Sequence, residues 1–203
     1  MSIGCKSLIL NRLQNIYQMA CSLTTGRSVP CKSAFGGIKE VRFADFGSIK
    51  SITIDGTGEA TIVPEGTPKY FSYKVKGNSS LETTVTSSRE NGTTFYTQTL
   101  TLTLPFLDAL TNAELYQIAI SRPYAIVIDY YGNAFLCGLN NGMELTGGTI
   151  VTGAAAGDLS GFTITMEGME ENAPWFLKVV PSAETTLIIP TPAGTPPLAG
   201  VSS

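Results

Sequence analysis

The amino-acid sequence predicts an all-β fold, mainly an antiparallel β-sandwich or barrel, with one flanking α-helix and extended N- and C-terminal arms. The first observation is that Leu100, Leu102 and Leu104 alternate with threonines over residues 97–104, which is typical of a long strand with one buried face. The second is a series of short apolar runs separated by turns that contain Gly and Asn. The third is that a clear helical pattern occurs only once after residue 35.

Length and composition favour one folded domain with extensions. The chain has 203 residues, of which 43% are hydrophobic, and this is enough for a sizeable core. We divide it into an N-terminal helix and arm (1–35), a β domain (36–178) and a Pro-rich C-terminal tail (179–203). The net charge is −3 and the sequence pI is about 5.0, which disfavours tight nucleic-acid binding. No stretch approaches the roughly 20 apolar residues of a membrane-spanning helix, so we expect no membrane insertion.

The chain contains no histidine, which removes Ser-His-Asp and Cys-His catalysis and every histidine-ligated metal or haem site. The four cysteines, Cys5, Cys21, Cys31 and Cys137, form no CxxC pair. We interpret them as ordinary thiols without a disulfide. We therefore predict no catalytic residue, no cofactor-binding residue, no metal site and no cofactor, and we predict that the protein is not an enzyme.

Acidic residues are the remaining candidates for catalysis. A glycosidase needs a pair of carboxylates, and Asp129, Asp158, Glu167 and Glu170 are available for one. The chain has 16 acidic residues and nothing in the sequence ranks one pair above another, so no catalytic pair is predicted.

Two glycine-containing stretches invite comparison with phosphate-binding loops. The trio Gly56-Thr57-Gly58 lacks the third glycine, the lysine and the following helix of such a loop, so a hairpin turn is expected there. Residues 153–158 have no Lys or Arg beside them, and we expect no nucleotide site.

The N-terminal segment is expected to form an amphipathic helix that packs on the sheet or on a neighbouring subunit, followed by a linker over residues 22–37. An alternative is a lipoprotein signal, because Lys6 precedes an apolar start and a cysteine, Cys21, follows a small residue. Against it, Asn11 and Arg12 interrupt the apolar region. The apolar residues at helical spacing are Ile9, Leu13, Ile16, Tyr17 and Ala20.

Strands of the first half are expected at residues 38–43, 50–54, 59–63, 70–76, 80–88 and 94–104. The last three are separated by turns at residues 77–79 and 91–92, which predicts a three-stranded meander. Asn78 and Asn91 also begin glycosylation patterns, which we interpret as turn residues.

One helix and four further strands follow. Pro105 ends the long strand, and Thr111 and Glu114 form a capping box that predicts a helix over residues 112–121, ended by Pro123. Its expected buried residues are Leu115, Ile118 and Ala119.

The apolar run at residues 124–130 predicts a central strand, which is joined by a turn at 131–133 to a strand at 134–139. The final strands fall within residues 143–170, where glycines indicate bulges or close backbone approach. The C-terminal tail is expected to be extended, and its apolar residues 187–189 suit an added strand on a neighbour.

Several short motifs follow one another between residues 31 and 174. They are Gly36-Gly37-Ile38-Lys39, Asn91-Gly92-Thr93, Tyr96-Thr97-Gln98, Asn112-Ala113-Glu114-Leu115, Glu144-Leu145-Thr146-Gly147, Gly157-Asp158, Gly161-Phe162 and Gly168-Met169-Glu170. In these motifs the chain resembles tail-tube-like virion proteins of tailed bacteriophages, particularly phages of Bacteroides-type hosts, the crAss-like phages among them.

The resemblance implies a tail-tube-like β-sandwich or barrel subunit that assembles into a homo-oligomeric ring, a hexamer or a dodecamer. The inner sheets of such rings join into a conduit for genome ejection. It implies a location in the phage tail of the virion, after assembly in the cytoplasm of the host bacterium. The implied partners are other phage tail or head-tail connector proteins and DNA that passes through without specific binding. The position, a repeated tube or a specialised ring, stays open. The alternative is a secreted or lipid-anchored β-sandwich that serves as an adhesion or binding module.

Overall fold

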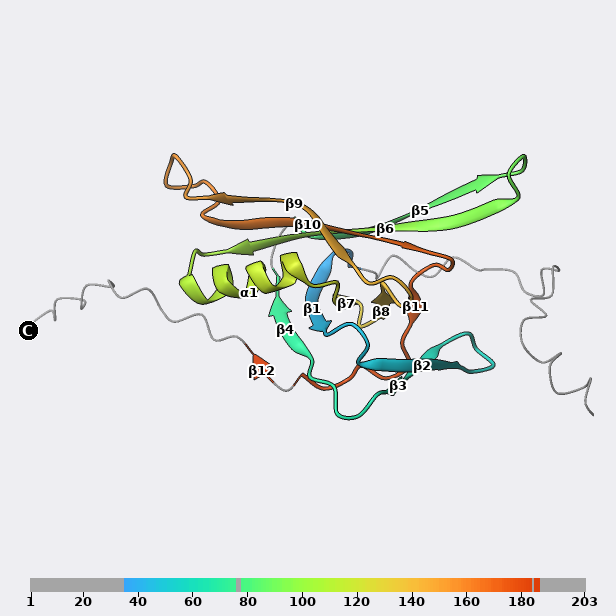
Figure 1. Cartoon of the computed structure of the whole chain (residues 1–203). Coiled ribbons are helices and arrows are strands. Elements are labelled where there is room, and N and C mark those ends of the chain that lie inside the picture. The colour runs from blue at the N-terminus through green and yellow to red at the C-terminus, as the bar shows by residue number, and fades with distance from the viewer. Residues whose placement is uncertain (1–34, 76–77, 184, 187–203) are drawn as a thin grey trace, which may run out of the picture. The chain divides into compact units, whose positions relative to one another are not determined.

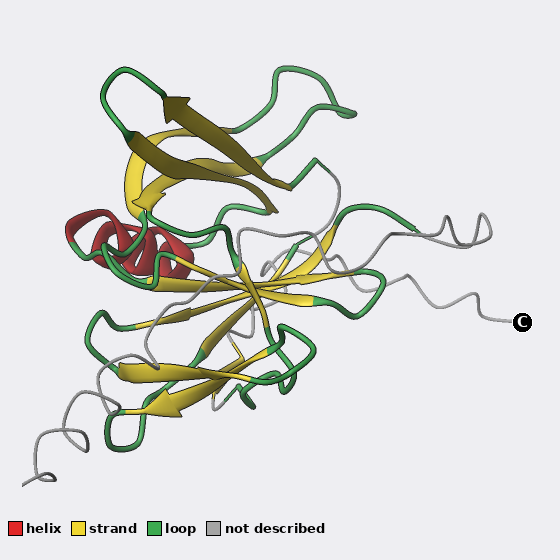
Figure 2. Ribbon diagram, turned by 90° about the vertical axis from the view of Figure 1, so that its right-hand side faces the viewer, coloured by secondary structure: helices red, strands yellow, loops and turns green. Residues whose placement is uncertain are grey.

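The computed structural model describes residues 35–75, 78–183, 185 and 186 (Figure 1). This part of the chain consists mostly of β-strands in antiparallel sheets, with one helix, as the sequence predicts (Figure 2). The expected N-terminal helix lies outside the described residues. The elements are β1 (Ile38–Ala44), β2 (Ile49–Ile54), β3 (Ala60–Pro64), β4 (Phe71–Lys74), β5 (Ser80–Ser88), β6 (Thr93–Pro105), α1 (Ala109–Ile120), β7 (Tyr124–Asp129), β8 (Ala134–Cys137), β9 (Glu144–Val151), β10 (Gly161–Glu170), β11 (Trp175–Phe176) and β12 (Thr185–Thr186).

The strands form two larger sheets and one separate hairpin. A six-stranded sheet has the order β11-β8-β7-β1-β4-β12, and a four-stranded sheet has the order β5-β6-β10-β9. The hairpin β2-β3 forms a two-stranded sheet of its own and pairs with neither of them. Paired strands are antiparallel except for β12, which runs parallel to β4. Figure 1 shows the four-stranded sheet above the other elements, with the β5-β6 and β9-β10 hairpin tips at opposite ends.

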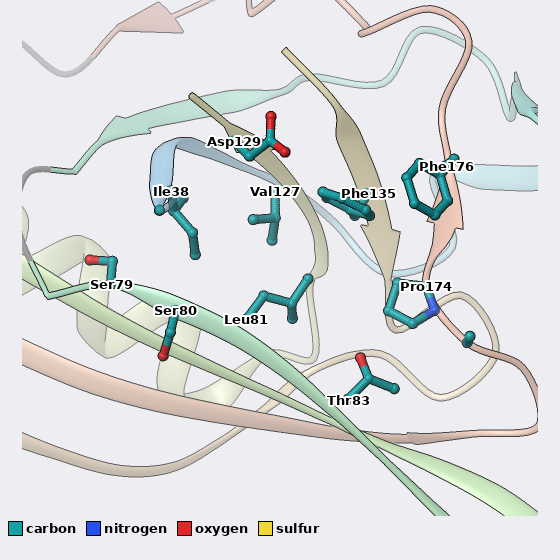
Figure 3. A pocket seen from close by; sticks show the side chains of 12 residues that line it. Ile38, Ser79, Ser80, Leu81, Thr83, Val127, Asp129, Phe135, Pro174 and Phe176 are labelled. Carbon is teal, nitrogen blue, oxygen red and sulfur yellow. The ribbon is translucent and has the colours of Figure 1, made fainter. Parts of the chain in front are cut away.

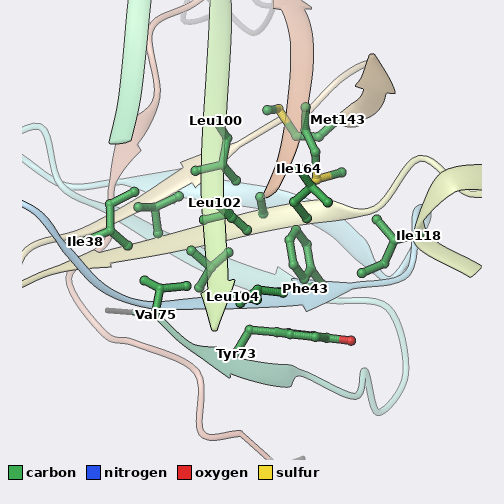
Figure 4. Close-up of a cluster of buried hydrophobic side chains, with 14 of the residues drawn as sticks. Ile38, Phe43, Tyr73, Val75, Leu100, Leu102, Leu104, Ile118, Met143 and Ile164 are labelled. Carbon is green, nitrogen blue, oxygen red and sulfur yellow. The ribbon is translucent and has the colours of Figure 1, made fainter. Parts of the chain in front are cut away.

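The main core lies between the two larger sheets (Figure 4). From the six-stranded sheet, Val41, Phe43, Tyr73 and Val127 contribute to it. The four-stranded sheet contributes the leucines of β6 and the residues opposite them on β10, which confirms the buried face that the Thr-Leu alternation predicts. These cross-strand pairs are Leu100–Met166, Leu102–Ile164 and Leu104–Phe162.

Strand β7 is central in the six-stranded sheet, between β1 and β8, as its continuous apolar run predicts. Ala125 and Val127 face the main core, whereas Tyr124 and Ile126 face a second cluster on the other side. Residues of the β2-β3 hairpin and Leu177 contribute to this second cluster. Both faces of the sheet are therefore covered.

The meander predicted from residues 70–104 is wrong. Strand β4 pairs with β1 in the six-stranded sheet, whereas β5 pairs with β6 in the four-stranded sheet. Tyr73 near one end of this connection and Leu81 near the other both pack in the main core. An alternating pattern gives the buried face of each strand but does not say which sheet the strand joins.

Helix α1 begins earlier than the capping box predicts. The carboxylate of Asp108 accepts hydrogen bonds from the backbone N–H and the hydroxyl of Thr111, at 2.6 and 2.5 Å, and so occupies the N-cap position. Ala119, expected to be buried, is exposed because the buried stripe starts one helical turn earlier. The buried residues of α1 are Thr111, Leu115 and Ile118.

Glycines within residues 143–170 allow close backbone approach, as expected. A Cβ atom at Gly161 would overlap the carbonyl oxygen of Leu104 on the paired strand. At Gly148, a Cβ would lie 3.1 Å from the carbonyl oxygen of Thr163. A β-bulge between Thr165 and Met166 interrupts the β9-β10 register.

The segment after β11 crosses to the far edge of the six-stranded sheet, where β12 pairs with β4. Along this path Leu177 donates its N–H to the carbonyl of Ala134 at 2.8 Å, and Lys178 donates to Ala60 at 3.0 Å. The guanidinium of Arg42 donates to the carbonyl of Pro181. Residues 187–189, which the sequence suggests as an added strand, lie outside the described residues.

Candidate assembly surfaces

The four candidate carboxylates lie in different turns, loops and strands. Asp129 accepts hydrogen bonds from the backbone N–H and side-chain amide of Asn133, at 2.7 and 2.8 Å, and closes the β7-β8 turn. Asp158 accepts the backbone N–H groups of Ala155 and Ala154, and these bonds lower the pKa of Asp158 below its ordinary value of 3.8. Two N–H donors of the glycine-containing loop at 153–158 are therefore used by the loop itself.

Glu170 is 4% exposed, and its carboxylate accepts the backbone N–H groups of Asn140 and Asn141 at 2.9–3.0 Å. Glu167 instead belongs to the outer face of the four-stranded sheet. The four candidates thus lie in different local structures and are not assembled into one site. In the part of the chain that the structure describes, no group of three or more His, Cys, Asp or Glu residues is placed to hold a metal ion.

The trio Gly56-Thr57-Gly58 lies in the turn of the β2-β3 hairpin, as expected. The carboxylate of Asp55 closes this turn by accepting the backbone N–H groups of Thr57 and Glu59, at 2.9 and 3.1 Å. Hydrogen bonds from the Thr57 hydroxyl and from Lys178 hold the pKa of Asp55 well below its ordinary value.

Cys137 is a free, fully buried thiol. Burial, and to a lesser degree the charge of Glu170, raises the pKa of Cys137 above its ordinary value of 9.0. A thiol in this setting is poor in the reactive thiolate form, which agrees with a packing role. The other three cysteines lie outside the described residues.

The outer face of the four-stranded sheet points away from the core and is rich in threonine. The strand registers place a threonine at most outward positions of β6 and continue the pattern onto its neighbours. The outward threonines within these registers are Thr84, Thr86, Thr93, Thr97, Thr99, Thr101, Thr103, Thr149, Thr163 and Thr165. We call this surface the threonine face.

A row of carboxylates crosses the threonine face. Glu82 of β5 lies opposite Thr99 of β6, which lies opposite Glu167 of β10, which in turn lies opposite Glu144 of β9. Glu167 and Glu144 are directly opposed, and like charges in such positions destabilise a sheet. A guanidinium nitrogen of Arg122 lies 3.9 Å from the Glu144 carboxylate and offsets part of this repulsion. None of the 13 Lys and Arg residues of the chain lies in strands β5, β6, β9 or β10. The sequence did not reveal this row, because only the register aligns its members.

The two larger sheets differ in how their edges are protected. The edge strands of the six-stranded sheet, β11 and β12, have two residues each, and very short edges are a common protection against pairing with another chain. The edges of the four-stranded sheet, β5 and β9, have nine and eight residues. Neither contains Lys, Arg or Pro, which often block such edges, and no described strand pairs with their outer sides. One glutamate in each strand and the β-bulge in the β9-β10 register give partial protection.

A groove with a volume of about 410 Å³ opens beneath β5 (Figure 3). Leu81, Phe135 and Phe176 supply much of its apolar wall. Its one carboxylate, that of Asp129, is already bonded to Asn133. The groove therefore suits apolar contact better than polar chemistry.

No protein-family model, curated protein or solved structure matches this chain. The helix found among the described residues is too short to cross a membrane. The role of the domain is therefore argued from its surfaces. The most distinctive of them are the long edges of the four-stranded sheet, β5 and β9, and the threonine face.

Proposed function

We propose that this protein is a structural protein of a bacteriophage tail that assembles into rings, which form or extend the conduit for genome delivery. The observation that carries the proposal is the four-stranded sheet with two long edges that pair with no other strand among the described residues. Exposed edges of this length pair readily with other chains, and joining them between copies satisfies their backbone groups. The motif resemblance described above supplies the phage tail as the setting.

The strand order suits a ring. Neighbouring strands in the order β5-β6-β10-β9 are antiparallel, so β5 and β9 run in opposite directions. Strand β9 of one copy can then pair antiparallel with β5 of the next, with the same face turned inward in every copy. Such a contact uses two different surfaces and closes into a ring when the rotation per copy divides a full turn.

The proposed ring has the threonine face toward its axis. The other face of the four-stranded sheet carries the rest of the domain, which needs the larger circumference on the outside. The row formed by Glu82, Glu167 and Glu144 then repeats in each copy as an acidic belt around the channel. Arg122 lies beside Glu144 and offsets part of this charge, but the three carboxylates keep the row negative, so that the channel wall repels phosphates and lets DNA pass without binding.

Electron microscopy of the concentrated full-length protein tests this proposal. Rings of uniform diameter, or tubes built from them, are expected. Sedimentation of the same sample should give a mass that is a fixed multiple of 21.5 kDa. A strictly monomeric protein at millimolar concentration contradicts the proposal and favours the adhesion or binding module.

Reversing the charge of the belt is expected to make the channel retain DNA. In Glu82→Lys/Glu167→Lys, each copy gains two lysines on the threonine face, and rings should bind double-stranded DNA that the native rings do not hold. If four or more phosphates are contacted, log affinity should fall with log salt at a slope of about −4 or steeper. Filter binding over a salt series provides the measurement.

The matched control for this experiment is Glu65→Lys/Glu59→Lys, which adds the same charge beside the β2-β3 hairpin, outside the four-stranded sheet. Rings of the control should hold no more DNA than native rings. Equal DNA retention by both double variants would show that the threonine face does not line the channel.

A further inference from the structure

Helix α1 is largely apolar on its exposed side as well as on its buried side, with Asn112 and Gln117 as its exposed polar residues. Leu110, Tyr116 and Ile120 are 49%, 64% and 65% exposed, and Ala113 lies between them at helical spacing. A helix on the surface of a domain usually has a polar outer side. The only charged residue of α1 is Glu114, which is partly buried. We call Leu110, Ala113, Tyr116 and Ile120 the helix ridge.

The groove beneath β5 is the second apolar surface without a partner among the described residues (Figure 3). Phe135 and Phe176 lie in its wall with their ring centroids 4.7 Å apart, and Phe176 is 51% exposed. Exposed aromatic side chains in a concave apolar surface are typical of an interaction site. The larger apolar lining residues are Ile38, Leu81, Val127, Phe135, Pro174 and Phe176.

The ridge and the groove lie at opposite sides of the domain. Residues Val127 and Asp129, near the end of β7, line the groove, whereas α1 lies next to the start of β7, joined to it through Pro123. In the four-stranded sheet, the groove is walled by edge strand β5, whereas α1 lies near the other edge strand, β9. Both surfaces are on the side of this sheet that faces the core.

We propose that the helix ridge of one copy occupies the groove beneath β5 of the next copy, alongside the pairing of β9 with β5. This inference rests on the proposed function, because it takes the neighbour to be the adjacent copy in the ring. Four strands at about 4.8 Å spacing repeat every 19 Å or so, which sets the step from one copy to the next. That step carries the α1 side of one copy to the groove side of its neighbour.

The chemistry of the two surfaces agrees with this contact. The ridge has no charged side chain, and the carboxylate of Asp129 in the groove keeps its hydrogen bonds to Asn133, so the contact does not leave these acceptor atoms without donors. The contact also removes the exposed Tyr116, Ile120 and Phe176 from water, which is the main source of its free energy. Because the ridge and the groove are different surfaces, the contact gives every copy in the ring the same direction.

Disulfide cross-linking between copies tests the contact. The full-length chain with Cys5, Cys21 and Cys31 replaced by Ser, and with the buried Cys137 retained, provides the background. Tyr116→Cys and Phe176→Cys are made separately in it, mixed at a concentration that gives rings, and oxidised. A covalent dimer is expected in the mixture, at least about fivefold more abundant than in either variant alone. The control replaces Tyr116→Cys by Val179→Cys, which has a similar exposure of 63% but lies in the segment after β11.

The outcomes separate this contact from the ring itself. Rings without cross-linking above the Val179→Cys control overturn the contact and leave the proposed function standing. Cross-linking without rings supports the contact and overturns the ring. The absence of both overturns both. In the chain with its native cysteines, an intrachain disulfide between Phe176→Cys and Cys5, Cys21 or Cys31 would show that the N-terminal segment fills the groove, and the contact would be wrong.

Discussion

Proline in the free edge of β5 is expected to abolish ring assembly while the domain stays folded. Adjacent residues of an antiparallel strand direct their N–H groups to opposite sides, so one of Thr84 and Val85 faces β6 and the other faces the free edge. Both are exposed in β5. Thr84→Pro and Val85→Pro therefore test the two sides separately, because proline has no N–H to donate.

One of the two proline variants lacks the N–H that faces the free edge. This variant should have the same free energy of unfolding as the native monomer and should form no rings. The proline removes one hydrogen bond from every contact and leaves the facing carbonyl without its donor, which costs about 1–3 kcal/mol and weakens each contact roughly 5- to 150-fold. Circular dichroism reports the fold, and sedimentation with electron microscopy reports assembly. Thr84→Ala and Val85→Ala keep the N–H groups and serve as controls that should still assemble. Normal rings from both proline variants would exclude pairing through this part of the β5 edge.

Phe162→Ala is expected to lower the free energy of unfolding by about 3–5 kcal/mol. Phe162 is 2% exposed on β10, opposite Leu104 of β6, and its ring packs in the main core. Removing the ring loses buried apolar contacts and leaves a cavity that the two sheets cannot close fully. Urea denaturation at a dilution where the protein is monomeric gives the free energy without a contribution from assembly.

Thr163→Ala is the matched control, because it removes side-chain atoms from the next residue of the same strand. Thr163 points to the threonine face and is expected to cost less than about 1 kcal/mol in the monomer. If Thr163→Ala destabilised the monomer as much as Phe162→Ala does, the assignment of the two faces of this sheet would be wrong.

Local patterns in the sequence predicted much of the secondary structure. The Thr-Leu alternation of β6 placed its leucines in the core, and the apolar run of β7 placed that strand at the centre of a sheet. The helix was predicted, but its start was not, because Asp108 takes the N-cap position in place of Thr111. Two capping residues three positions apart are both plausible in a sequence, and the choice depends on which residues the helix buries.

The candidate assembly surfaces were only partly visible in the sequence. The outward threonines of β6 follow from alternation within one strand. The row of Glu82, Glu167 and Glu144 depends on three strand pairings that bring together residues from 82 to 167, a span of 86 positions in the chain. The long edges of the four-stranded sheet depend on the strand order, which places β10 between β6 and β9.

The sequence by itself determined which residues of β6 face the core, where most turns fall, and that the described domain is β-rich with one helix. These features depend on a residue's immediate neighbours, through the two-residue repeat of strands and the conformations that Gly, Asn and Pro favour. Only the tertiary structure decided that β4 and β5 belong to different sheets, which strands form the edges, and that the helix ridge and the groove lie on opposite sides. Alternating strands can bury the same side chains in several arrangements, and the packing of the whole core selects among them.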